Sequence, residues 1–195
     1  MKRLMTHVVM MFPLVSGALA ADLESLFEAG QFQQVVDAVT PDTAAPGDLY
    51  LAAQSYDRLM QPGEARAMYE RLAAREDAWR EVGHSAIALL EQNVGEALRT
   101  AHRATQAEPM LAEAHYQHGH AQAHKGDFAA AAAAFEKAAS LDAGFAYAHY
   151  YAGLSYYRNK RIDLMARHFE AFLKLAPKAP ERPEVESIMR TVRGR

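Results

Sequence analysis

The feature that most constrains the fold of this chain is a pattern of small, aromatic and proline residues that returns every 34 residues. In the clearest unit, residues 112–145, the small residues at positions 8, 20 and 27 and the aromatic residue at position 24 are Gly119, Ala131, Ala138 and Phe135. The neighbouring units keep part of the pattern through Ala97, Ala104, Pro109, Gly153, Phe169 and Pro177. A fixed period of this length is typical of proteins that stack one structural unit repeatedly.

The residue types in the pattern suit paired helices. Alanine-rich stretches favour helix over strand. Small residues at positions 8 and 20 let two helices approach closely, and a bulky residue at position 24 fills the space beside them. Proline at position 32 ends the second helix, because proline cannot continue one. The sequence therefore predicts an all-α fold.

The pattern resembles the tetratricopeptide repeat family, and the central unit is the best match. The resemblance implies an α-solenoid of stacked antiparallel helix pairs. Three units depart least from the family, namely 78–111, 112–145 and 146–179. The outer two contain substitutions at pattern positions: Ser85, Met165 and Phe172.

The rest of the mature chain extends the same architecture. Residues 46–77 suggest another helix pair, and a truncated pair ends near Thr40. We therefore expect about five helix pairs in one domain over residues 21–179. Residues 180–195 carry apolar residues at helical spacing beside arginines and predict a C-terminal capping helix.

Residues 1–20 have the order of a secretory signal peptide. Lys2 and Arg3 precede an apolar run from Val8 to Val15, and Ala18 and Ala20 form a small-residue cleavage site. The apolar run is shorter than the roughly 20 residues that cross a bilayer. We expect cleavage before Ala21 and a periplasmic or secreted protein, with an uncleaved anchor as the alternative.

Composition excludes several classes of function. The chain has no cysteine, which excludes a disulfide framework and a thiolate metal site. Removing residues 1–20 changes the net charge from −3 to −5, because two basic and no acidic residues are lost, so no general attraction to nucleic acid is expected. The charge is uneven, with a net −6 over residues 21–60 and +5 over residues 158–195.

The resemblance implies that the first helix of each pair lines a concave groove. The groove positions of this chain carry a row of tyrosines with one tryptophan, a composition typical of peptide-binding surfaces. The predicted groove residues are Tyr50, Gln54, Arg58, Trp79, Val82, Glu113, Tyr116, His120, His124, Tyr147, Tyr150, Leu154, Tyr157 and Arg158. We expect Tyr116 and Tyr150 to add little to the core. The alternative is that the rings pack between repeats.

The groove lacks the lysine and asparagine with which some family members grip a carboxylate terminus, since Tyr116 and His120 occupy those positions in the central unit. We therefore expect it to favour apolar or aromatic segments. His120 and His124 share a helix face at a spacing that suits metal binding, but a zinc site needs further ligands. A histidine contact in the groove would titrate near pH 6.5.

The sequence contains no motif for phosphate binding, metalloprotease chemistry or nucleophilic catalysis. We therefore expect a non-enzymatic adaptor or scaffold without a cofactor, which binds a segment of another protein and assists assembly of an envelope or secreted complex. Two alternatives remain open: a metal-binding or accessory enzyme component organised around His120 and His124, and a structural protein that associates head to tail through its acidic and basic ends.

Overall fold

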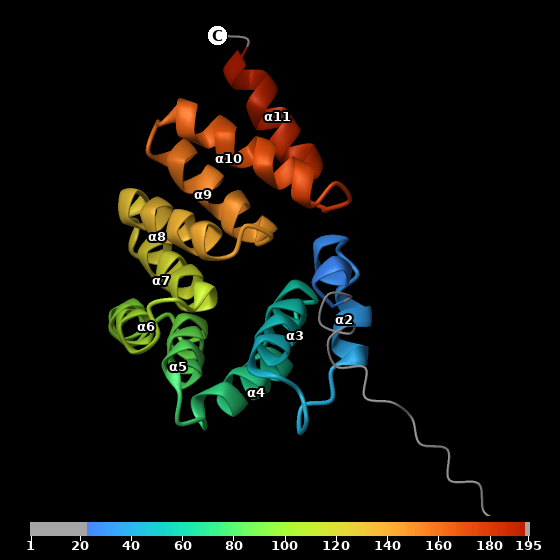
Figure 1. Ribbon diagram of the computed structural model, residues 1–195, viewed down its shortest axis with the longest axis vertical. Coiled ribbons are helices and arrows are strands. Elements are labelled where there is room, and N and C mark those ends of the chain that lie inside the picture. Colours follow the sequence, from blue (N-terminus) through green and yellow to red (C-terminus); the bar gives the residue numbers. More distant parts are fainter. Residues whose placement is uncertain (1–22, 194–195) are drawn as a thin grey trace, which may run out of the picture.

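The computed structural model describes residues 23–193, and every regular element in this range is a helix. Residues 23–28 are helical and precede α2. The later helices are α2 (Phe32–Ala38), α3 (Pro46–Arg58), α4 (Pro62–Ala73), α5 (Ala78–Leu90), α6 (Val94–Ala107), α7 (Ala112–Lys125), α8 (Phe128–Leu141), α9 (Ala146–Arg158), α10 (Ile162–Leu175) and α11 (Arg182–Arg193). Consecutive helices pack as pairs along a curved stack (Figure 1), which confirms the expected all-α solenoid.

Local sequence explains where the helices begin and turn. Pro46 and Pro62 stand in the first turns of α3 and α4, where a missing N–H costs nothing. The side chains of Asp77, Asn93 and Asp127 cap α5, α6 and α8. The turn inside the central pair reverses at Gly126, which has the left-handed φ of 85° that glycine adopts without strain.

The small residues at position 8 lie where the two helices of a pair meet. A Cβ placed on Gly119 of α7 would lie 2.7 Å from the ring of Phe135 on α8. Gly153 of α9 faces the ring of Phe169 on α10 in the same way. These contacts agree with the predicted positions of the glycines and aromatic residues in the repeat.

The capping helix covers the end of the stack. Val185 and Met189 of α11 are buried and belong to the same core as the repeat helices. In the described part of the chain, no helix has the length and apolar character needed to cross a membrane. The predicted signal peptide, residues 1–20, lies outside the described residues.

The two ends of the stack come together across its concave side. The rings of Phe27 and Tyr147 meet edge to face with centroids 5.0 Å apart. Arg58 at the end of α3 pairs with Glu181 just before α11, and Glu181 also accepts a hydrogen bond of 2.9 Å from the Tyr147 hydroxyl. Gly30 packs against Pro180. The concave side is therefore closed by contacts between residues more than a hundred positions apart.

Candidate functional site

Closure of the stack leaves a first cavity of about 210 Å3 on the concave side, called here the central cavity. Its walls come mainly from α3, α5 and α7, with single residues from α4 and α9. The lining residues are Tyr50, Gln54, Asp57, Arg58, Tyr69, Ala86, Leu89, Leu90, Tyr116, Gln117, His120, His124 and Tyr151.

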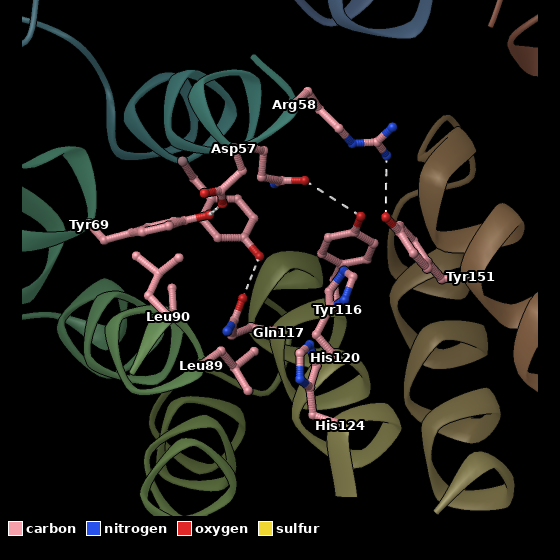
Figure 2. Close-up of a pocket in the computed structure, with 13 residues that line it drawn as sticks. Asp57, Arg58, Tyr69, Leu89, Leu90, Tyr116, Gln117, His120, His124 and Tyr151 are labelled. Atoms are coloured by element: carbon pink, nitrogen blue, oxygen red, sulfur yellow. Dashed lines mark hydrogen bonds between the residues drawn. The ribbon is translucent and has the colours of Figure 1, made fainter. Parts of the chain in front are cut away.

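The polar groups of the central cavity mostly pair with one another (Figure 2). The Tyr50 hydroxyl donates to Gln117 at 2.8 Å, and the Tyr69 hydroxyl donates to Asp57 at 3.1 Å. Arg58 donates to the Tyr151 hydroxyl at 3.2 Å in addition to its pairing with Glu181. This network fixes tyrosine rings from several helices, and it leaves few polar groups of the cavity without a partner.

His120 is held among aromatic rings and stays neutral. Its ring lies 4.5 Å from the ring centroids of both Tyr116 and Tyr151. Burial, reinforced by the nearby His124 and Arg58, lowers the pKa of His120 to about 3. This lowered pKa runs against the expectation that His120 titrates near pH 6.5, because burial among the rings disfavours the charged imidazolium ion.

A second cavity of about 230 Å3, called here the acidic cavity, lies beside the first, and both are lined by Tyr50 and Gln54. It opens between residues 23–28, the first turns of α3 and α7, and the loop before α9. The lining residues are Glu24, Phe27, Glu28, Gly47, Asp48, Tyr50, Leu51, Gln54, Glu113, Asp142, Gly144, Phe145, Ala146 and Tyr147.

Carboxylates dominate the polar groups of the acidic cavity. Burial, together with the charges of Glu24 and Asp142, raises the pKa of Glu28 to about 7. Burial is also the main cause that raises the pKa values of Glu24 and Glu113. The acidic cavity thus concentrates negative charge in a partly desolvated place. The central cavity instead presents hydroxyl, amide and imidazole groups, with Asp57 bonded to Tyr69 and Arg58 paired with Glu181.

The structure distributes the predicted groove residues over three places. The central cavity is lined by Tyr50, Gln54, Arg58, Tyr116, His120 and His124. The acidic cavity shares the first two of these and adds Glu113 and Tyr147. Neither cavity is lined by Trp79, Val82, Tyr150, Leu154, Tyr157 or Arg158. The last two instead face a shallow hollow beside α11.

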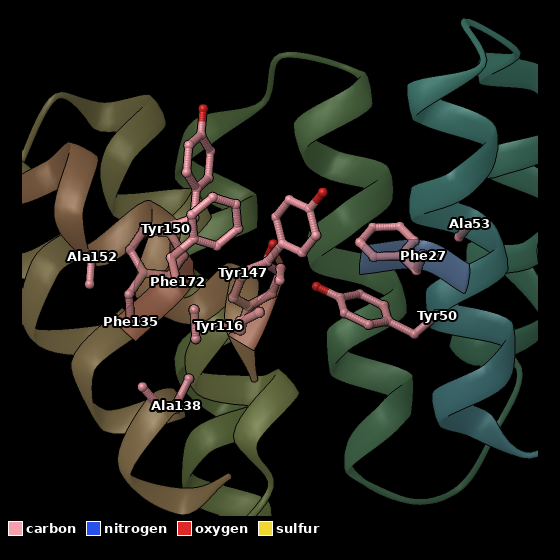
Figure 3. Packing of buried hydrophobic residues seen from close by; sticks show 14 of the residues in the cluster. Phe27, Tyr50, Ala53, Tyr116, Phe135, Ala138, Tyr147, Tyr150, Ala152 and Phe172 are labelled. Carbon is pink, nitrogen blue, oxygen red and sulfur yellow. The ribbon is translucent and has the colours of Figure 1, made fainter. Parts of the chain in front are cut away.

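Five predicted groove residues are core residues, namely Tyr50, Val82, Tyr116, Tyr147 and Tyr150. The expectation that Tyr116 and Tyr150 add little to the core is wrong, because these side chains are only 1% and 6% exposed. Tyr116 packs on Phe135 and Phe145. Figure 3 shows Tyr116 and Tyr147 facing Phe27 and Tyr50 across the concave side. Tyr150 packs likewise on Phe169 and Phe172 of the next helix, so the alternative, in which the rings pack within the stack, holds for Tyr116 and Tyr150.

Sequence reasoning missed several residues that line the cavities. Phe27, Glu24 and Glu28 belong to the truncated first pair, in which the sequence analysis identified no groove residue. Gln117 and Tyr151 stand beside groove positions of the pattern. The one usable signal was the acidic excess of residues 21–60. It indicated negative charge at this end but not that the charge would face the concave side.

Among the described residues, the structure adds no ligands to His120 and His124 that would complete a metal site. His120 and His124 line the central cavity, but the described residues contain no group of three or more histidine, cysteine, aspartate or glutamate side chains arranged to hold a metal ion. Zinc sites use three or four protein ligands. A pair of histidines is therefore too small a donor set by itself.

Comparison with known proteins places the chain among repeat proteins. The family model described as "Tetratricopeptide repeat" matches residues 112–145. No curated protein matches the sequence.

Several solved structures have a similar fold. The first TPR of Spaghetti (RPAP3), solved with the HSP90 peptide SRMEEVD, is 16% identical with a TM-score of 0.55 and aligns over 61% of this chain and 94% of its own. A structure of MamA is 18% identical with a TM-score of 0.51 and aligns over 86% of this chain and 98% of its own. YrrB, described as a TPR protein with an unusual peptide-binding site, is 21% identical with a TM-score of 0.50 over 82% of each chain. At these identities the likeness establishes the fold alone.

The family match covers α7 and α8, and the helix pairs on both sides stack on them in the same manner. The glycine and aromatic residue that meet inside the matched pair recur in the pair formed by α9 and α10. Residues 112–145 therefore match a tetratricopeptide repeat, and the neighbouring helix pairs continue the same fold.

Proposed function

We propose that this protein is a non-enzymatic adaptor that binds a segment of another protein on its concave side. The observation that carries the proposal is the pair of adjoining cavities, which share Tyr50 and Gln54 and so form one hollow of two compartments. An extended segment needs such a row of compartments, because successive side chains enter different ones. Two proteins of similar fold, RPAP3 and YrrB, are described by a bound peptide and by a peptide-binding site.

The chemistry of the hollow suits a protein segment. Tyrosine rings provide apolar contact area, and their hydroxyls provide hydrogen bonds at a low cost in side-chain entropy. The neutral His120 and the amide of Gln54 add groups that can bond to a peptide backbone. Because the rings are held by packing before any partner arrives, binding needs little ordering of the lining.

Photo-cross-linking tests the proposal directly. A photoreactive residue replaces Gln54, where the two cavities meet, and in a control protein it replaces Gln106, which is exposed on α6. We expect cross-links to a partner from the native host at position 54 and few at position 106. Equal cross-linking at both positions would contradict a concave binding site.

A second variant blocks the hollow. Gln54→Trp places a large ring at the boundary of the two cavities, on a side chain that is partly exposed and that accepts only a long 3.5 Å hydrogen bond from Tyr116. We expect partner capture to fall at least tenfold while helicity is retained. Capture at the original level by a folded Gln54→Trp protein would place the binding surface elsewhere.

We also propose that the protein is exported and helps to assemble an envelope or secreted complex. The support is the signal-like order of residues 1–20 in the sequence. N-terminal sequencing of protein from the native host should find Ala21 as the first residue. A full-length chain retained in membranes would contradict export. Head-to-tail self-association through the two charged ends stays a prediction, which sedimentation at low and high salt tests.

A further inference from the structure

The acidic cavity combines two features that are independent of each other. Its floor is aromatic, with Phe27, Tyr50 and Tyr147 buried and Phe145 partly buried. Figure 3 shows Phe27 and Tyr50 on one side of this floor and Tyr147 on the other. Carboxylates surround this floor. Acidic residues alone would form an ordinary solvated surface, but here they enclose a hollow of about 230 Å3 that has room for a side chain.

The carboxylates of the acidic cavity have no cationic partner within the described chain. They belong to Glu24, Glu28, Asp48, Glu113 and Asp142, and none of them takes part in an ion pair there. The nearby Arg58 is already paired with Glu181. The protein pairs many of its other acidic residues with arginine, so this group stands apart in lacking a counter-charge.

Helix dipoles offset only part of this negative charge. The first turns of α3 and α7 contribute Asp48 and Glu113, and α9 begins beside the cavity at Ala146. A helix N-terminus stabilises a nearby carboxylate only modestly. Burial, together with the charges of Glu24 and Asp142, nevertheless raises the pKa of Glu28 to about 7, so like charges still meet in this cavity.

We infer that the acidic cavity binds a lysine or arginine side chain of the partner segment, an inference that rests on the proposed peptide binding. The aliphatic stem of such a side chain packs on the aromatic floor, and its charged group reaches the carboxylates. A cation above aromatic faces gains further from the ring electrons. The partner segment is therefore basic at the residue that enters this cavity and apolar or aromatic where it meets the central cavity.

A metal ion fits this cavity less well than an organic cation. Calcium takes six to eight oxygen ligands that converge on one point. Within residues 23–193, the acidic side chains form no group of three or more that could hold a metal ion. Carboxylates spread around an aromatic floor match a cation with an apolar stem instead.

The first experiment probes the cavity with small cations. n-Butylguanidinium and n-butylammonium are titrated into the full chain, with n-butanol as the neutral probe, while NMR follows the rings of Phe27 and Tyr147. We expect both cations to shift these signals at millimolar concentration and n-butanol to leave them nearly unchanged. Equal effects of cations and n-butanol, or no effect of any probe, would overturn the inference.

Matched triple variants locate the effect. Glu24→Gln, Glu28→Gln and Glu113→Gln together should weaken cation binding at least tenfold. The control, Glu64→Gln, Glu76→Gln and Glu108→Gln, changes the net charge equally at exposed residues outside both cavities, and Glu64, like Glu113, stands in a first helical turn. The control should bind as the original protein does. Equal weakening in both variants would reduce the effect to general charge attraction and overturn the inference.

Peptides then separate this inference from the proposed function. Peptide libraries with a fixed central arginine, lysine, norleucine or glutamate are tested on the full chain, and we expect at least tenfold preference for the basic libraries. Binding without such preference overturns the inference and leaves the proposed function standing. Small cations that bind while no library does contradict both, because the inference names a protein segment as the source of the cation.

Discussion

The central and acidic cavities lie side by side and share Tyr50 and Gln54, yet the bonding of their polar groups differs. In the central cavity hydroxyls and amides bond to one another, as Tyr50 does to Gln117. In the acidic cavity the carboxylates face the hollow without a cationic partner among the described residues. A satisfied buried network stabilises the fold, whereas an unsatisfied group of like charges weakens it. The comparison assigns a structural role to the polar groups of the central cavity and the recognition of charge to those of the acidic cavity.

The largest expected loss of stability comes from a substitution in the lining of the central cavity. Tyr116→Ala removes a ring that is 1% exposed and packs on Phe135 and Phe145. Loss of a buried ring of this size costs about 3–5 kcal/mol of the free energy of unfolding. The control Tyr157→Ala removes a ring that is 40% exposed and should cost far less. Urea denaturation measures both variants. Similar losses would show that the central tyrosines do not carry the core.

A smaller change displaces α7, which contributes to both cavities. Gly119→Ala places a Cβ 2.7 Å from the Phe135 ring and should destabilise the protein by about 1–3 kcal/mol. Gly63→Ala is the matched control, because a Cβ there has no neighbour within 4 Å and should leave stability unchanged or raise it by about 0.4–1 kcal/mol. Thermal melting compares the two. A Gly119→Ala protein as stable as the Gly63→Ala protein would contradict the contact between α7 and α8.

The acidic cavity should lose stability as the pH rises. The pKa of Glu28 is about 7 in the folded protein and 4.5 without the surrounding charges and burial, so the folded state holds the proton more tightly. The stabilisation that the protonated Glu28 gives the folded state is therefore complete below pH 4.5, and it is lost as the pH rises through 7. At pH 8, Glu28→Gln should raise the free energy of unfolding by about 1 kcal/mol, allowing for the partial exposure of this side chain. Glu76→Gln, in an exposed position, should have no such effect. If Glu28→Gln does not raise the free energy of unfolding at pH 8, the charge of Glu28 does not destabilise the folded protein.

The central cavity should respond to pH in the opposite direction. His120 has a pKa of about 3 in the folded protein, below its ordinary 6.5, so only the unfolded chain takes up a proton between these values. The stabilisation that the neutral His120 gives the folded state is present above pH 6.5, and it is lost as the pH falls through 3. NMR should find the His120 ring unchanged between pH 5.5 and 7.5, while free histidine added as a reference titrates near pH 6.5. A His120 signal that titrates with the reference would show that the cavity does not disfavour the imidazolium ion.

Sequence reasoning predicted the elements of this fold because its evidence is local and periodic. The alternation of helices and the contact of Gly119 with Phe135 depend on residues within one 34-residue unit, and these recur along the chain. The candidate site was predicted in part. Gln54, Arg58 and His120 do line a cavity, but Val82 and Tyr150 are buried core residues. Periodicity identifies the face of a helix and does not say whether a distant part of the chain covers that face.

The sequence by itself therefore determined the stack of helix pairs and the acidic character of its first part. Only the tertiary structure decided that the stack closes, since each pair adds a small rotation and the sum brings distant ends together. The contacts that result, between Phe27 and Tyr147 and between Arg58 and Glu181, follow no repeat and leave no pattern in the sequence. They cover Tyr147 and turn the acidic residues of the first pair toward a cavity, because closure places both ends of the described chain around the same hollow.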